Sequence, residues 1–95
     1  MSDEKIIPVG KSLLGIELYR RESFSDSRGK FQRLMCTSDL QMDSRSFRIH
    51  QVNYSCTKTA GTVRGLHYQQ PPHSEIKIIQ CIRGVIFDVA LDLRN

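Results

Sequence analysis

Four side chains in the sequence could together move a proton next to a carbonyl group. His67 and Lys77 lie on either side of a Pro-Pro pair, Arg64 lies three residues before the histidine, and Arg28 lies further upstream. A histidine titrates near neutral pH and is the usual general base, and a lysine can stabilise a developing enolate oxygen. Arginine binds diphosphate oxygens through its planar guanidinium. These residue types favour proton abstraction beside a ketone, although a lone histidine in a strand is more often structural.

A metal site is the alternative for the same histidine. The nitrogen and oxygen side chains that could bind a metal are His50, His67, His73 and Glu75.

The spacing around His67 keeps the framework of the cupin metal motif without its ligands. Five residues separate Gly61 from His67, and six separate Lys77 from Gly84, as in that motif. However, Gln69 stands where the motif has its second histidine, and Lys77 stands where it has a glutamate. An ammonium group repels a metal ion. The pattern therefore predicts the barrel without the metal.

Length and composition limit the chain to one small globular domain. It has 95 residues, 39% of them hydrophobic and 25% charged, with a net charge of +4. The basic residues are scattered, whereas a nucleic-acid binder would more often cluster them and interleave aromatic residues. A small anionic ligand fits this pattern as well as a polyanion does. Three widely spaced cysteines, no signal peptide and no long apolar run predict a reduced, cytoplasmic protein that does not cross a membrane.

Alternation of apolar and polar residues with a period of two predicts an all-β fold, a sandwich or barrel. We divide the chain into an N-terminal extension, residues 1–14, and a single domain, residues 15–95. The expected strands are residues 15–21, 30–35, 47–55, 62–69, 76–82 and 85–93. The turn residues between them are 22–29, 58–61, 70–75 and 83–84, and residues 37–44 could form one helical turn or a loop.

Two features of these strands bear on a site. Phe47 and Ile49 share a strand face with Gln51 and Asn53, so this face either opens into a polar cavity or leaves its amides in water at a sheet edge. A bulge at Gly65 would bring Arg64 and His67 to the same side of their strand.

Several ordered blocks resemble the dTDP-4-dehydrorhamnose 3,5-epimerase family of the cupin superfamily. The blocks are FSDSRGKF at residues 24–31, HQVNYS at residues 50–55, and the long run VRGLHYQQPPHSEIKIIQCIRGVIFDVALDLR from Val63 to Arg94. The resemblance covers nearly the whole chain. It implies a cupin-type jelly roll, a dimer and no required metal or other cofactor.

The resemblance also implies a role for each matching residue. His67 corresponds to the base that removes protons from the carbons beside the C4 ketone of a dTDP-sugar, and Lys77 to the residue that stabilises the enolate oxygen. The substrate-binding positions are Arg28, Phe31, Gln51, Asn53 and Arg64, with Arg28 on the diphosphate and Phe31 against the base.

Members of the family are about twice as long as this chain. Their later strands supply a tyrosine that acts as the opposing acid and an aspartate that pairs with the histidine, so we expect a truncated, N-terminal part of the fold. Three functions stay open: a 3,5-epimerase, a non-catalytic module that binds nucleotide sugars or assembles with another chain, and a sugar 3,4-ketoisomerase. Unpaired strand edges predict a homodimer or association with a complementary chain.

Overall fold

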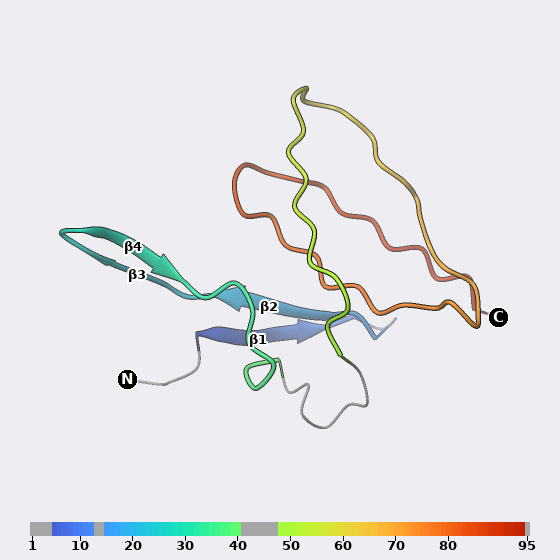
Figure 1. Ribbon diagram of the computed structural model, residues 1–95, viewed down its shortest axis with the longest axis horizontal. Helices are drawn as coiled ribbons and strands as arrows, with labels where there is room; N and C mark the ends of the chain where they lie inside the picture. Colours follow the sequence, from blue (N-terminus) through green and yellow to red (C-terminus); the bar gives the residue numbers. More distant parts are fainter. Residues whose placement is uncertain (1–4, 13–14, 41–47, 95) are drawn as a thin grey trace. The chain divides into compact units, whose positions relative to one another are not determined.

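A computed structural model describes residues 5–12, 15–40 and 48–94 (Figure 1). The chain divides into two compact units, Met1–Val52 and Asn53–Asn95, which are called here the first and the second unit. Every regular element in the described residues is a β-strand, in two small antiparallel sheets. The prediction of an all-β chain is confirmed.

The first sheet pairs β1 (Ile6–Lys11) with β2 (Glu17–Arg21) in antiparallel register. Ile6 lies opposite Arg21, and Lys11 lies opposite Glu17. The register shifts between Pro8 and Gly10, where the proline has no N–H to donate to the ladder. β2 was expected from the sequence. β1 was not, and it lies within the segment that we assigned to an N-terminal extension.

The second sheet is a hairpin of β3 (Ser23–Asp26) and β4 (Gly29–Gln32). The predicted turn over residues 22–29 is therefore shorter than expected, because only Ser27 and Arg28 make the turn. Asp26 closes it: the Arg28 N–H donates to Asp26 Oδ1 over 2.8 Å, the local bond that favours aspartate at turns. Phe24 and Phe31 face each other across the hairpin.

Among its described residues, the first unit has a small core that contains one charged side chain. Ile6 and Leu40 are buried, with Tyr19, Met35 and Cys36 packed against them. Residues 37–40 form a turn, in which the Leu40 N–H donates to the Cys36 carbonyl over 3.1 Å. This confirms the described part of the helical turn or loop predicted over 37–44; residues 41–44 lie outside the described residues.

Asp39, only 8% exposed, connects this turn to the start of β1. Its Oδ2 accepts hydrogen bonds from the backbone N–H groups of Lys5 and Ile6, each over 3.2 Å, and pairs with Arg33 over 3.3 Å. Burial raises the pKa of the Asp39 carboxyl, but these donors outweigh it and hold the pKa below its usual value. The ionised carboxylate therefore fixes the N-terminal strand to the core.

The second unit has turns but, in its described residues 53–94, no regular strand. The chain folds back on itself in long, gently curving segments (Figure 1). It bends at residues 58–61, 71–73 and 82–84, close to where turns were expected, and the His73 N–H donates to the Gln70 carbonyl over 2.8 Å. Between these turns the predicted strands have no regular ladder.

The apolar side chains of this unit are uncovered, which explains the missing ladders. Val85 is 96% exposed and Phe87 is 94% exposed. Strands gain most of their stability from neighbouring strands and from a packed face. Without that cover, alternation alone does not produce a sheet. No helix in the described part of the chain is long and apolar enough to span a membrane.

Candidate functional site

His67 and Lys77 are brought together by the turn that contains Pro71 and Pro72. The Lys77 ammonium donates to the backbone carbonyl of His67 over 3.4 Å, although ten residues separate them. Prolines cannot continue a strand ladder, so the chain turns here and returns beside its earlier course. The turn therefore places the lysine ammonium against the backbone of His67.

The Lys77 ammonium has a second contact, with Glu75. Its Nζ lies 3.4 Å from Glu75 Oε1. The sequence prediction considered Glu75 only as a metal ligand. The sequence did contain a signal for this contact. Glu75 and Lys77 are two positions apart, and in an extended segment this spacing puts both side chains on the same face.

Gly65 leaves room for the His67 imidazole. Its φ is +100°, a region that glycine enters easily and other residues rarely. A Cβ added at Gly65 would lie 3.1 Å from His67 Nδ1 and 3.3 Å from the His67 backbone nitrogen. The backbone is irregular at Gly65, where a bulge would have brought Arg64 and His67 to the same side, and the absence of a side chain lets the imidazole lie against it.

Arg64 contacts the turn that precedes it. Its Nε donates to Thr57 Oγ1 over 3.2 Å, and Thr62 Oγ1 donates to the Thr59 carbonyl over 2.7 Å in the same turn. Thr57 is a second residue that sequence reasoning missed. It holds the guanidinium through Nε, so the two terminal nitrogens keep donors that can reach an anion.

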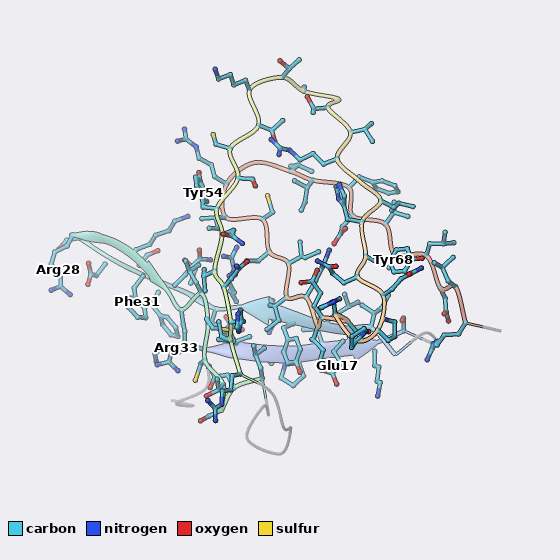
Figure 2. All side chains as sticks on the ribbon, turned by 45° about the vertical axis from the view of Figure 1, so that its right-hand side comes forward. Glu17, Arg28, Phe31, Arg33, Tyr54 and Tyr68 are labelled. Atoms are coloured by element: carbon cyan, nitrogen blue, oxygen red, sulfur yellow. The ribbon has the colours of Figure 1, made fainter. Side chains whose placement is uncertain are left out.

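Arg28 lies at the tip of the β3–β4 hairpin, and Phe31 lies closer to the base of the hairpin (Figure 2). The Arg28 guanidinium pairs with the Asp26 carboxylate, with NH2 2.7 Å from Oδ2. The hydrogen bond from the Arg28 side chain lowers the pKa of Asp26, and the same bond raises that of Arg28. Exposed pairs of this kind contribute little to stability, so a diphosphate can compete with Asp26 for the guanidinium.

Phe31 presents an open ring on the same hairpin. It is 55% exposed, whereas Phe24 opposite it is partly buried. The Lys5 ammonium lies 4.9 Å from the centroid of the Phe24 ring, a cation–π distance. Lys5 therefore covers a face of the Phe24 ring. The Phe31 ring stays accessible to a planar ligand.

The predicted site residues fall into both units. The first unit holds Arg28, Phe31 and Gln51, and the second holds Asn53, Arg64, His67 and Lys77. Gln51 and Asn53 are both exposed. Within the described residues, no three or more histidine, cysteine, aspartate or glutamate side chains are grouped as a metal ion would require.

Comparison with known proteins gives one consistent answer. The profile of the dTDP-4-dehydrorhamnose 3,5-epimerase family matches residues 11–95. The chain belongs to this family. Its membership confirms the resemblance seen in the RGLHYQ and DVALDLR blocks.

Relatives from distant organisms share this description. The dTDP-4-dehydrorhamnose 3,5-epimerase of Sinorhizobium fredii is 36% identical over 83 residues, which is 87% of this chain and 43% of the relative. That of Methanothermobacter thermautotrophicus is 37% identical over 84 residues, 88% of this chain and 44% of the relative. The chain thus spans less than half the length of these curated relatives. No solved structure matches it.

Proposed function

We propose that this member of the epimerase family carries the base-and-lysine part of a site that epimerises C3 and C5 of a dTDP-4-dehydro-6-deoxyhexose. The observation that carries the proposal is the contact between the Lys77 ammonium and the His67 carbonyl within one unit. His67, Lys77 and Arg64 are called here the half-site. They supply the base, the oxyanion-stabilising cation and a cation for the substrate.

The chemistry follows from the acidity of hydrogens beside a ketone. The His67 imidazole takes the proton from the carbon next to C4, and the electron pair of that C–H bond moves to the carbonyl oxygen. The resulting enolate oxygen is stabilised by an N–H donor of Lys77. Return of a proton to the opposite face completes the epimerisation, and no electrons are gained or lost overall. The donor of that proton is expected outside the half-site.

Solvent proton exchange tests the half-site directly. The chain is incubated with a dTDP-4-keto-6-deoxyhexose in deuterium oxide, and deuterium at the two carbons beside the ketone is followed by NMR. His67→Ala should abolish the exchange, whereas His73→Ala should leave it unchanged. Exchange that survives His67→Ala would remove His67 from the role of base.

The nucleotide is proposed to bind the β3–β4 hairpin, with its diphosphate on Arg28 and its base against Phe31. Arg28→Ala should weaken the binding of thymidine diphosphate by roughly tenfold to a hundredfold, because charge-assisted hydrogen bonds are lost. The matched control is Arg20→Ala, which removes another exposed ion pair of the first unit, Arg20 with Glu22 at 2.9 Å. Equal affinities for Arg28→Ala and the wild-type chain would exclude Arg28 from the site.

A binding module without turnover is the second candidate function. Its support is the location of Arg28 and Phe31 on a hairpin of the first unit, whereas the half-site residues lie in the second. Nucleotide-sugar binding without deuterium incorporation would favour this function. Incorporation that depends on His67 would favour the epimerase.

The exposed apolar side chains of the second unit support association, either as a homodimer or with a complementary chain that completes a cupin-type jelly roll. The free cysteines Cys36, Cys56 and Cys81 support a reducing, cytoplasmic setting. Light scattering across a concentration series would report the mass of the assembly. A monomer at every concentration would exclude the homodimer.

A further inference from the structure

The Asp26 carboxylate takes up one edge of the Arg28 guanidinium. Asp26 Oδ2 accepts hydrogen bonds from Arg28 Nη2 over 2.7 Å and from Nε over 3.3 Å, and Oδ1 accepts a longer one from Nε over 3.4 Å. A guanidinium binds a carboxylate or phosphate through two parallel N–H groups, on its Nε–Nη2 edge or on its Nη1–Nη2 edge. In Arg28 the first of these edges is already used.

The turn holds the carboxylate beside the guanidinium through a separate bond. The Arg28 backbone N–H donates to Asp26 Oδ1 over 2.8 Å, a bond that is typical of aspartate at tight turns. The side-chain hydrogen bond from Arg28 also lowers the pKa of Asp26 below its ordinary value, so the carboxylate is charged at neutral pH. An anion that approaches Arg28 therefore meets a carboxylate that is already bound there.

We infer that Asp26 is a specificity-determining residue of the nucleotide site, acting as an internal competitor for the Arg28 guanidinium. The inference rests on the proposed binding of a nucleotide diphosphate to Arg28. A diphosphate can use the Nε–Nη2 edge only by displacing Asp26. At the Nη1–Nη2 edge it lies one guanidinium away from a like charge. In both positions the carboxylate lowers the affinity of Arg28 for anions.

The same ion pair also orders the Arg28 side chain, which works in the opposite direction, because an ordered side chain loses less entropy when a ligand binds. The Arg28 and Asp26 side chains are, however, 88% and 52% exposed, and exposed ion pairs order their side chains weakly. A nucleotide diphosphate carries more than one negative charge and would lie within the screening length of about 10 Å at 0.1 M salt. Competition and repulsion therefore outweigh the gain from order.

The consequence is selectivity for ligands that have a second point of attachment. Phe31, on the same hairpin, is 55% exposed and offers its ring to a base. A nucleotide diphosphate gains from both Phe31 and Arg28, whereas inorganic phosphate and small carboxylates depend on Arg28 alone. Asp26 therefore keeps simple anions off the hairpin while a nucleotide still binds.

Asp26→Asn removes the competitor and keeps the turn. Asparagine has the same shape and retains an Oδ1 acceptor for the Arg28 backbone N–H, but it has no charge. Binding of thymidine diphosphate, measured by titration calorimetry, should become about threefold to tenfold tighter, because the loss of an exposed ion pair and of a nearby like charge each contributes a few-fold. Binding of inorganic diphosphate, which has no base, should tighten by a similar factor.

Glu22→Gln is the matched control. Glu22 holds Arg20 through Nε and Nη2 in the same unit, so this variant frees another exposed guanidinium and loses the same charge. It should leave the affinity for thymidine diphosphate within about twofold of the wild-type value. An equal gain in the two variants would overturn the inference, because Asp26 would then act only through the net charge.

A double-mutant cycle with Arg28→Ala tests whether Asp26 acts through Arg28. In the Arg28→Ala background the gain from Asp26→Asn should fall below about twofold, because the diphosphate is no longer held beside residue 26. A gain of full size without Arg28 would overturn the inference. Weaker or unchanged binding in Asp26→Asn alone would overturn it as well, since order would then matter as much as competition.

The two single variants distinguish failure of the inference from failure of the proposed function. Weaker binding in Arg28→Ala without a gain in Asp26→Asn would retain Arg28 as the diphosphate ligand and reject the role of Asp26. Unchanged binding in Arg28→Ala would refute the proposed diphosphate site, and the inference with it. A titration without nucleotide tests the pair itself: by carboxyl ¹³C NMR, the pKa of Asp26 should rise in Arg28→Ala towards the ordinary value of about 3.9. Equal values in the two proteins would show that no pair forms and would overturn the inference.

Discussion

The two units of the chain show opposite relations between sequence pattern and structure. The first unit has modest alternation, yet its described residues form four strands in two sheets. The second contains the predicted strands 62–69, 76–82 and 85–93, and its described residues form turns without a regular strand. Alternation therefore identifies residues suited to a sheet, but a sheet forms only where partners are available.

The difference has a physical cause in the range of the contacts. β1 pairs with β2, and β3 with β4, across short connections, so little loop entropy opposes the pairing. The runs of the second unit are apolar on faces that nothing in the unit covers. Strands of that kind depend on packing against further strands, as in a complete barrel.

The units also differ in how their charges are held. Asp39 is buried and accepts hydrogen bonds from two backbone N–H groups, and Arg33 pairs with it. The ion pairs of the second unit, Lys77 with Glu75 and Arg94 with Asp92, are accessible to water. Removing the buried charge of Asp39 should therefore unfold structure in the first unit, whereas removing a charge of an exposed pair should change only local geometry.

Asp39→Ala should give the largest effect, confined to the first unit. It leaves the N–H groups of Lys5 and Ile6 without their acceptor beside the core, which is among the costlier single changes in a small domain. The thermal midpoint of the first unit should fall by roughly 10 °C or more. Residue-resolved amide exchange on heating measures this, with Ile6 and Tyr19 as reporters.

Asp26→Ala is the matched control, because Asp26 is an exposed aspartate of the same unit paired with Arg28. In this variant the thermal midpoint of the first unit should shift by no more than about 2 °C. Similar shifts for the two variants would mean that Asp39 is no more important than a surface charge, and the contrast between the units would fail.

Lowering the pH should destabilise the first unit in part as Asp39→Ala does, because it protonates the Asp39 carboxylate. The pKa of its carboxyl lies below the usual value in the folded chain, so the ionised form favours folding. That stabilisation is complete above the unfolded pKa of about 3.9 and is lost as the pH falls through the lower, folded value. The thermal midpoint of the first unit should drop below about pH 4, and Asp39→Ala should flatten the profile. A variant profile as steep as that of the wild type would assign the acid sensitivity to other carboxyl groups.

Short-range features of the chain could be predicted from the sequence, whereas features that depend on distant contacts could not. The all-β class and β2 follow from alternation, and the turns around Lys58, Pro71 and Gly84 follow from residue chemistry. β1 was missed because Pro8 and Gly10 weaken the strand signal, and its stability depends on Asp39, 33 residues away from Ile6. In the site, the residue types pointed to the half-site, but the contacts of Glu75 and Thr57 depend on how the backbone turns.

The smallest effect should come from Gly65→Ala, which changes the geometry around His67 without removing a functional group. The added methyl would lie 3.1 Å from His67 Nδ1 on a backbone with φ at +100°. Gly61→Ala is the matched control, since Gly61 has φ at +82° and no other atom within 4 Å of an added Cβ. Both variants carry the backbone strain of a left-handed alanine, about 1 to 2 kcal/mol, but only Gly65→Ala displaces the imidazole.

In the deuterium-exchange assay, Gly65→Ala should therefore be slower than Gly61→Ala by about threefold to tenfold, because misplaced bases transfer protons poorly. Equal rates would mean that the imidazole moves freely away from residue 65. Gly65 would then serve only the backbone, and the second unit would hold its histidine less rigidly than the first holds Asp39.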